Sequence, residues 1–428
     1  MMPSNNLPDN FKETEIGPIP ADWEIAPLGE LCTVRGGKRL PKGHSFSEKP
    51  TPFPYIRVTD FANWSVDPLN LRYLTPEDRE KLERYIITAD DVYISIAGTI
   101  GRVGTIPEQL NNANLTENAA RIIISDKRKL DNRYLVGFLA SNRGQGQIDI
   151  RMTKTSQPKL ALTRIKQIPV PLPPLPEQRR IARVLSTIQR AIAAQDDLIA
   201  AAREVKRSLM QRLFTYGPGP DPAPTKETEI GEIPEHWEVV ALGDLARIVM
   251  GQSPPGSSYN QTGDGIPLIN GPAEFGDKFP IFVKWTRQPT KVCQMGDILF
   301  CVRGNTTGRM NIADDEYCIG RGVASIRGID ELSDTSYLFF LLERKNSEVF
   351  NIAVAGGSTF PNITKSRLRN LKVPSPSLAE QQHIADMLSV IDRKIAADEQ
   401  RKAALQALFK AMLHQLMTGQ VRVKEVDL

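Results

Sequence analysis

The stretch PVPLPPLPEQRRIARVLSTIQRAIAA, residues Pro169–Ala194, decides the fold because the chain contains it twice. The second copy, KVPSPSLAEQQHIADMLSVIDRKIAA, occupies Lys372–Ala397, which is 203 residues further on. Each copy opens with a proline-rich run. Proline lacks the amide donor and fixes φ, so the run is predicted to be extended and not to form a central strand. A helix is predicted to start at Pro176 in the first copy and at Ala379 in the second.

A heptad pattern follows each proline-rich run. Apolar side chains recur at alternating spacings of four and three residues, and both patterns continue to Leu213 and Leu416 with the same register. A sustained repeat of 3.5 residues predicts a coiled-coil seam. The clearest seam positions are Ile181, Leu185, Ile188, Ile192, Ile384, Leu388, Ile391 and Ile395. At about 1.5 Å per residue, each helix would be roughly 60 Å long.

The two seams are predicted to cover each other, because neither can stay exposed to water. A short linker, YGPGPDPAPT, follows the first helix, and a whole second domain then returns the chain to the second helix. Antiparallel pairing therefore suits the connectivity and creates a pseudo-twofold axis, whereas parallel pairing would crowd both domains at one end. The polar seam residues Gln195, Asp398 and Lys402 are expected to fix the register. The alternative is that each helix packs on another subunit.

The repeat extends well beyond the helices, which makes it the main guide to architecture. Lys12–Leu31 and Lys226–Leu245 are identical at thirteen of twenty positions, and Asp91–Arg102 is similar to Asp297–Arg309. The middles of the two copies diverge, since Lys38–Tyr85 has no obvious equivalent in the second half. Matched parts are expected to meet the same kind of partner twice, and unmatched parts to meet two different targets.

The predicted fold is α+β, with two mixed, mostly β domains separated by a long antiparallel two-helix spacer. Short runs rich in β-branched residues, such as Tyr55–Val58, Asp91–Ala97 and Ala120–Ser125, predict strands, and Arg133–Ser141 predicts a short helix. The predicted boundaries are 1–10 for a flexible N-terminus, 11–175 for the first domain, 176–216 for the first helix, 217–225 for a linker, 226–378 for the second domain, 379–418 for the second helix and 419–428 for a tail.

Several functional classes lack their sequence signals. No apolar run reaches the roughly 18 residues of a membrane span, and the polar N-terminus does not resemble a signal peptide. The four cysteines form no CxxC pair and the four histidines are scattered, so neither a disulfide framework nor a metal site is expected. Cys293 and Cys301 lie in apolar surroundings and are predicted to be buried thiols. A reducing cytoplasm fits this pattern. No phosphate-binding loop and no HExxH motif occur, and Gly98–Gly104 is predicted to form a hairpin turn. No catalytic residue is therefore predicted.

A recognition chemistry remains. Polar side chains next to glycines in the unmatched stretches can hydrogen-bond to base edges or phosphates. Any one such stretch would by itself be read as an ordinary surface loop, but they recur at matched topological positions. The predicted DNA-binding residues are Lys38, Arg39, Lys42, Arg57, Thr59, Arg102, Lys154, Gln252, Ser253, Asn270, Arg303, Asn305, Arg309, Arg321 and Thr359.

These segments resemble the specificity (S) subunits of type I restriction–modification systems. The resemblance is carried by TEIGPIPADWEIAPLGEL, ISIAGTIGRVG and PLPPLPEQRRIARVLSTIQRAI, together with their second copies, and it extends from Lys12 to Gly419. It implies two target-recognition domains that each read half of an interrupted double-stranded DNA sequence. It also implies docking of two methyltransferase (M) subunits and of restriction (R) subunits. S-adenosylmethionine, ATP and Mg²⁺ would be used by those partners, with no cofactor on this chain.

Two other functions stay open on the sequence alone. A formal net charge of +4 permits nucleic-acid binding without arguing for it, so a coiled-coil scaffold without DNA specificity is one alternative. A self-contained nuclease with an unusual site is the other. Binding to random DNA as tight as to any selected sequence would favour the scaffold, and metal-dependent cleavage by the purified chain would favour the nuclease.

Overall fold

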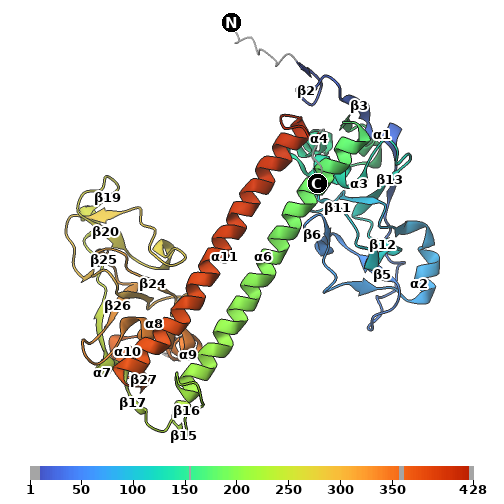
Figure 1. The fold of residues 1–428 in the computed structure, drawn as a ribbon. Coiled ribbons are helices and arrows are strands. Elements are labelled where there is room, and N and C mark those ends of the chain that lie inside the picture. The colour runs from blue at the N-terminus through green and yellow to red at the C-terminus, as the bar shows by residue number, and fades with distance from the viewer. Residues whose placement is uncertain (1–9, 154–155, 356–360, 424–428) are drawn as a thin grey trace. The chain divides into compact units, whose positions relative to one another are not determined.

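The computed structural model describes residues 10–153, 156–355 and 361–423. It consists of two compact units. Unit 1 comprises Met1–Asp197 and Gln400–Leu428, and unit 2 comprises Leu198–Glu399. The division falls inside the two longest helices, α6 (Leu175–Tyr216) and α11 (Leu378–Thr418), so each unit contains one end of each helix (Figure 1). Both helices begin one residue earlier than the sequence predicts.

Unit 1 is built around two four-stranded sheets. The first is entirely antiparallel, and the second contains the parallel pair β5–β12. The first sheet has the order β11 (Val103–Thr105), β10 (Val92–Ser95), β13 (Ala119–Ile124), β4 (Cys32–Gly36), and the second β8 (Arg72–Tyr73), β5 (Pro54–Ile56), β12 (Ala113–Leu115), β9 (Ile86–Ile87). Two-stranded pairs are β1 (Phe11–Lys12) with β2 (Ile19–Pro20), β3 (Glu24–Pro27) with β14 (Pro169–Leu172), and β6 (Phe61–Ala62) with β7 (Ser65–Val66). The short helices are α1 (Leu28–Leu31), α2 (Pro76–Lys81), α3 (Asn132–Ala140), α4 (Asn142–Arg151) and α5 (Leu162–Ile165).

Unit 2 repeats the first sheet and varies the second. Its antiparallel sheet has the order β18 (Ala246–Met250), β26 (Val323–Gly328), β23 (Ile298–Cys301), β24 (Met310–Ile312). Its second sheet has five strands in the order β19 (Tyr259–Asn260), β21 (Trp285–Thr286), β20 (Ile266–Ile269), β25 (Tyr317–Ile319), β22 (Val292–Cys293), with β20 and β25 parallel. Pairs are β15 (Thr225–Thr228) with β16 (Gly231–Pro234) and β17 (Glu238–Ala241) with β27 (Lys372–Ser375), and the short helices are α7 (Leu242–Leu245), α8 (Thr335–Arg344), α9 (Asn346–Val354) and α10 (Lys365–Arg369).

The α+β composition of both units is confirmed, but two predicted strands are shorter than expected. The strand predicted over Asp91–Ala97 covers Val92–Ser95. The strand predicted over Tyr55–Val58 ends at Ile56, and a 3₁₀ turn follows over Val58–Asp60. The Asp60 carboxylate accepts a hydrogen bond from the Arg57 backbone N–H at 2.7 Å and so caps this turn. The predicted hairpin is present, because β10 and β11 pair antiparallel on either side of the Gly98 turn.

Within each unit, the ends of α6 and α11 run in opposite directions. In unit 1, Ile181 near the start of α6 shares a core with Leu416 near the end of α11. Further along, Lys402 pairs with Asp196 at 2.5 Å. In unit 2, Lys206 pairs with Asp392 at 2.8 Å, and Arg203 with Glu399 at 2.6 Å. Of the eight predicted seam residues, Ile181, Leu185, Ile384 and Leu388 are buried, and Ile188, Ile192, Ile391 and Ile395 are half-buried.

A buried glutamine ties the start of α6 to unit 1. The Gln178 side chain is fully buried, and its Nε2 donates to the carbonyl oxygens of Lys129 and Pro173, both at 2.9 Å. Its Oε1 accepts from the Asp131 backbone N–H at 3.0 Å. A fully satisfied buried amide fixes both the helix and the loop before α3, because each lost bond would leave a backbone group unpaired.

Unit 2 contains the same lock at Gln381. Its Nε2 donates to the carbonyl oxygens of Leu332 at 3.1 Å and Pro376 at 3.0 Å. Its Oε1 accepts from the Asp334 backbone N–H at 2.9 Å. The glutamine of each hinge copy therefore has one structural role, which explains why it recurs in both.

The glutamate beside each glutamine is held by different partners in the two units. In unit 1, the buried Glu177 accepts two hydrogen bonds from Arg422, at 2.7 and 2.8 Å, and the guanidinium lies 5.5 Å from the centre of the Trp23 ring. In unit 2, Glu380 pairs with His236 at 2.8 Å and accepts from the Trp237 indole at 3.1 Å.

The four cysteines, Cys32, Cys293, Cys301 and Cys318, are free and buried, which confirms the burial predicted for Cys293 and Cys301. Burial raises the pKa of the Cys32 and Cys293 thiols to about 12. Within the described residues, no cluster of three His, Cys, Asp or Glu side chains has the arrangement of a metal site. None of the helices in that part of the chain combines the length and apolar character needed to cross a bilayer.

Candidate nucleic-acid interface

The predicted DNA-binding residues lie at strand ends and turns of both units. Lys154 and Thr359 are outside the described residues. The others fall in four places: after the ends of β4 and β18, after the ends of β5 and β20, in the hairpin turns after β10 and β23, and, for Arg321, between β25 and β26.

In unit 1, the chain leaves β4 through a turn that only glycine fits. The Gly37 N–H donates to the Ala119 carbonyl and the Lys38 N–H to the Leu115 carbonyl, both at 2.9 Å. A Cβ atom on Gly37 would lie 2.1 Å from the carbonyl oxygen of Thr116, far inside van der Waals contact. The close backbone approach therefore requires glycine.

In unit 2, the chain leaves β18 through the same turn. The Gly251 N–H donates to the Val323 carbonyl at 2.8 Å, and the Gln252 N–H donates to the Ile319 carbonyl at 2.9 Å. A Cβ atom on Gly251 would lie 2.2 Å from the Gly320 carbonyl oxygen. Gln252 is thus the structural equivalent of Lys38.

A second backbone bond in each unit completes the match. The Thr116 N–H donates to the Ile56 carbonyl at 3.0 Å, and the Gly320 N–H donates to the Ile269 carbonyl at 2.8 Å. The residues next in the chain after these four bonded residues are therefore structurally equivalent as well. We call the resulting pairs the strand-end positions: Lys38 and Gln252, Arg39 and Ser253, Arg57 and Asn270, Glu117 and Arg321.

At the strand-end positions of unit 1, an ion pair is exposed at the surface. Arg39 Nε donates to Glu117 Oε1 at 2.6 Å, and the Arg39 side chain is 76% exposed. Glu117 Oε2 accepts from Thr116 at 3.0 Å, and Tyr55 donates to the Lys38 carbonyl at 2.9 Å. Partial burial alone would raise the pKa of Glu117, but the hydrogen bonds from Arg39 and Thr116 lower it overall. Glu117 is therefore an ionised, oriented acceptor near neutral pH.

At the strand-end positions of unit 2, amide and hydroxyl groups replace that ion pair. Ser253 Oγ lies 3.4 Å from Asn270 Oδ1 and accepts from the Arg321 backbone N–H at 3.2 Å. Gln252 and Arg321 are exposed. A Cβ on Gly320 would lie 2.1 Å from Asn270 Oδ1, so the glycine permits this close packing. The strand-end positions of unit 2 therefore carry neutral hydrogen-bonding side chains and one cation, Arg321, on a backbone that matches that of unit 1.

Arg57 occupies a strand-end position, but its guanidinium is used inside unit 1. Its Nη2 donates to Asp60 Oδ1 at 2.6 Å and to the Asn70 carbonyl at 2.9 Å. Thr59 Oγ1 lies 3.3 Å from Asp60 Oδ1. Asp60 is buried, so this arginine balances a buried carboxylate and fixes the loop. Lys38, Arg39 and Glu117 therefore lie together at the strand ends, whereas the Arg57 guanidinium is bound to Asp60 and to the Asn70 carbonyl.

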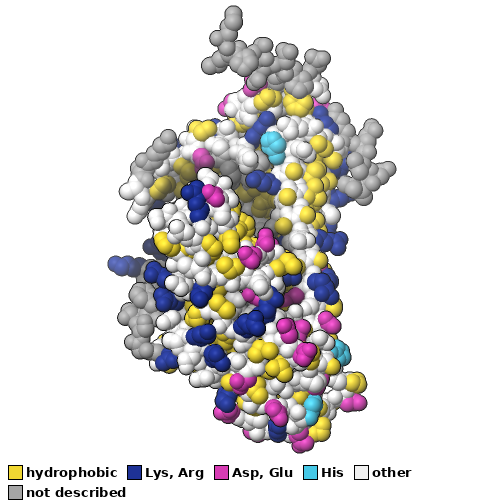
Figure 2. Space-filling model, turned by 90° about the vertical axis from the view of Figure 1, so that its left-hand side faces the viewer, with side chains coloured by type: hydrophobic (Ala, Val, Ile, Leu, Met, Phe, Trp, Pro, Cys, Tyr) yellow, Lys and Arg dark blue, Asp and Glu magenta, His cyan; other side chains and the backbone are white. Residues whose placement is uncertain are grey.

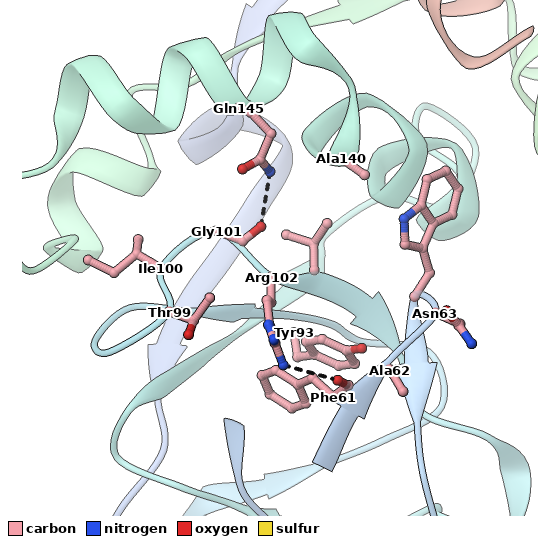
Figure 3. A pocket seen from close by; sticks show the side chains of 12 residues that line it. Phe61, Ala62, Asn63, Tyr93, Thr99, Ile100, Gly101, Arg102, Ala140 and Gln145 are labelled. Carbon is pink, nitrogen blue, oxygen red and sulfur yellow. Dashed lines mark hydrogen bonds between the residues drawn. The ribbon is translucent and has the colours of Figure 1, made fainter. Parts of the chain in front are cut away.

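Arg102, at the hairpin turn of unit 1, contacts the divergent segment. Its Nη1 donates to the Phe61 carbonyl at 3.4 Å, and Gln145 Nε2 donates to the Gly101 carbonyl at 3.0 Å (Figure 3). The Phe61 ring stacks on Tyr93 at 3.8 Å between centres. These side chains line an open hollow of about 540 Å³ between the hairpin turn, the β6–β7 pair and α4. Arg102 connects the repeated hairpin to the non-repeated segment.

Arg309 has the equivalent contact in unit 2. Its Nη1 donates to the Pro272 carbonyl at 3.1 Å, and its Nη2 donates to the Phe275 carbonyl at 2.8 Å. The matched arginines thus each hold the carbonyl of a phenylalanine in the divergent segment. By contrast, Arg303 and Asn305 on the same turn are exposed, as is Lys42 in unit 1. These three remain available for an external ligand.

A groove rich in arginine distinguishes the helix surface of unit 1. It is about 550 Å³ in size and is lined by Asp131, Arg133, Arg179, Ala182, Arg183, Ser186 and Arg190. The residues 203 positions further on, Ser336, Gln382, Asp386 and Arg393, include one arginine only. Elsewhere, Lys and Arg side chains gather across the middle of the face in Figure 2, and Asp and Glu are more frequent toward its bottom.

Sequence reasoning missed Glu117 and Tyr55. Neither is a typical DNA-binding residue by type, and Glu117 is 78 residues from Arg39 in the sequence. A signal was available: extending the repeat through ENAARIII and RGVASIRG aligns Glu117 with Arg321. The opposite charges of that aligned pair would have marked the position.

The chain is similar to known proteins over nearly its whole length. The family model described as the type I restriction modification DNA specificity domain matches residues 20–202 and 234–407. The specificity subunit named for type I restriction enzyme MjaX of Methanocaldococcus jannaschii is 34% identical over 423 residues, covering 97% of both chains. The MjaVIII specificity subunit of the same organism is 27% identical over 440 residues, covering 98% of this chain and 97% of its own.

Solved structures agree in fold. A chain from a structure of a type I R-M system, titled for its complex assembly and conformational transition, has a TM-score of 0.56 and 26% identity, covering 94% of this chain and 99% of its own. The S subunit of a type I restriction–modification system from M. genitalium has a TM-score of 0.64 at 14% identity, covering 97% and 99%. The second likeness bears on the fold alone.

Proposed function

The chain belongs to the type I restriction–modification DNA specificity family and is a specificity subunit of such a system. From this premise we propose that each unit reads one half of a bipartite, interrupted sequence in double-stranded DNA. Unit 1 would read one half with Lys38, Arg39 and Lys42, and unit 2 the other with Gln252, Ser253 and residues of its hairpin turn.

The observation that carries this proposal is the set of strand-end positions. Their backbones match, bond for bond, while their side chains differ in charge and hydrogen-bonding type. A scaffold that only joined partners would have no need to vary these positions between its halves. Two readers of different base sequences need the same platform with different donors and acceptors.

The spacer role of α6 and α11 is a second part of the proposal. Opposite helix directions within each unit support an antiparallel coiled coil with pseudo-twofold symmetry. Such a coil would set the separation of the two half-sites, as a fixed distance between readers does in other two-headed DNA-binding proteins.

Two methyltransferase subunits would dock on the repeated segments Lys12–Leu31 and Lys226–Leu245, and the restriction subunits would join through them. The locks at Gln178 and Gln381 support two similar docking frames, since they fix each helix start to its unit in the same way. The arginine groove on α6 makes the two frames unequal in charge, so the two partner copies would not make identical contacts.

The chain itself would carry no catalytic residue and no cofactor. S-adenosylmethionine, ATP and Mg²⁺ would be bound by the methyltransferase and restriction subunits, and the complex would work on DNA in the cytoplasm. Adenine methylation would therefore require the partner, because this chain would supply only the choice of sequence.

Reconstitution tests the proposal. The purified chain, its methyltransferase partner and the two together are each incubated with DNA and S-adenosylmethionine, and methylated adenines are located by sequencing. We expect methylation only from the complex and only within one interrupted motif. Methyl transfer by this chain alone, or methylation without a sequence motif, would contradict the proposal.

A further inference from the structure

The strand-end pair Glu117 and Arg321 is the place where the two units differ most in chemistry. The residue before each donates its N–H to the end of a parallel strand, at 3.0 Å in unit 1 and 2.8 Å in unit 2. The residues lie just before β13 and β26, which pair in the same way with β4 and β18. One site on the platform thus carries an anion in one unit and a cation in the other.

A carboxylate is an unusual group for a surface that meets DNA. Phosphates repel it, and it cannot donate a hydrogen bond to them once ionised. Its useful partners on DNA are the exocyclic amino groups of cytosine N4 and adenine N6, which donate in the major groove. A carboxylate at such a place is therefore suited to base reading and not to backbone contact.

The surroundings of Glu117 prepare it for that role. Arg39 and Thr116 hold the two carboxylate oxygens at 2.6 and 3.0 Å, which fixes the orientation of the group. Each carboxylate oxygen can accept more than one hydrogen bond. The Tyr55 hydroxyl lies 3.5 Å from Oε2, beside Thr116, so Oε1 is the oxygen that retains capacity for a ligand. Arg39 also places a positive charge beside the carboxylate and offsets its repulsion of phosphates. Glu117 remains 27% exposed, which leaves it accessible from solvent.

Arg321 has the opposite properties at the same site. It is exposed, and its backbone is fixed by the bond to Ser253 at 3.2 Å. A guanidinium suits the O6 and N7 acceptors of guanine, to which it can donate two bonds at once. The neighbouring Gln252 and Asn270 are amides, which favour adenine.

We propose that Glu117 and Arg321 are equivalent specificity-determining residues, with Glu117 reading an amino-bearing base in one half-site and Arg321 reading guanine in the other. This inference rests on the proposed function, because it assumes that each unit reads one half-site.

The test uses the chain purified together with its methyltransferase subunit. Bound sequences are selected from a random duplex library and sequenced, for the wild type and for Glu117→Gln, Arg321→Gln and the control Glu108→Gln. Glu108 is an exposed glutamate of unit 1, away from the strand-end positions, so it matches the first change in chemistry. Unfolding midpoints of all variants are measured alongside.

We expect Glu117→Gln to relax one position of one half-site, where the wild type selects cytosine or adenine, by about tenfold to a hundredfold. Arg321→Gln should relax one guanine position of the other half-site by a similar factor, and the control should change nothing. The inference is overturned if Glu117→Gln leaves the motif intact, alters both half-sites, or weakens binding to all sequences alike. Absence of any motif in the wild type would instead overturn the proposed function, and the inference with it.

Discussion

Replacing Gln381 by methionine is expected to destabilise unit 2 by about 3 kcal/mol. The change removes three hydrogen bonds, to the carbonyl oxygens of Leu332 and Pro376 and from the N–H of Asp334. Leaving a buried backbone group unpaired costs about 1–3 kcal/mol. Two of the three bonds are only partly buried, so water can partly replace them, and the lower value of about 1 kcal/mol per bond applies. Methionine has nearly the same volume, so no cavity adds to the loss.

Hydrogen exchange measured by mass spectrometry tests this prediction by segment. A loss of about 3 kcal/mol corresponds to a hundredfold or greater acceleration, since 1.4 kcal/mol is tenfold. We expect that acceleration in peptides covering the start of α8 and strand β27, while unit 1 peptides stay unchanged. The matched control is Gln382→Met, because the adjacent Gln382 is exposed and should be indifferent to the change. Unaltered protection in the Gln381→Met protein would show that the glutamine lock does not stabilise the hinge.

Three further changes probe other contacts. Burial alone would raise the pKa of Glu380, but hydrogen bonds from His236, Trp237 and Ser377 outweigh it and lower that pKa to about 2. The stabilisation from the ionised carboxylate is therefore present above about pH 4.5 and is lost as the pH falls toward 2. The difference in thermal midpoint between the wild type and Glu380→Gln should shrink over that pH window. Arg422→Ala leaves the buried Glu177 unpaired and should lower the free energy of unfolding of unit 1 by about 2 kcal/mol in urea titrations. The loss is smaller than for a fully buried ion pair because Arg422 is partly exposed. An unchanged unfolding midpoint would show that Arg422 does not stabilise the helix start through Glu177. Four residues inserted after Ala200 add about 6 Å of rise and should widen the gap between half-sites by roughly one to two base pairs. An insertion of two residues should instead abolish assembly of the complex. Mapping of methylated sites measures both effects, and an active four-residue variant with an unchanged gap would exclude the spacer role.

Features that depend on neighbours in the sequence were accessible from the sequence alone. The heptad spacing, the proline-rich run before each helix and the repeated segments predicted the two long helices, the α+β class and the family. Proline and β-branched residues act on their own backbone, so their effect does not wait for tertiary contacts. The early strand end at Ile56 also has a local cause, since the Asp60 carboxylate accepts a hydrogen bond from the Arg57 N–H and turns the chain.

The chemistry of the candidate interface was decided by tertiary structure. Glu117 meets Arg39 only because β12 pairs in parallel with β5 and β13 pairs with β4. The Arg57 guanidinium donates to Asp60 and that of Arg102 to a backbone carbonyl. The sequence does not distinguish these two arginines from the exposed Arg39. The sequence shows which side chains are able to bind DNA, but the register of the sheets determines which of them already have a partner within the protein. Hydrogen bonds and ion pairs form between groups brought within about 3 Å of each other, regardless of their separation along the chain.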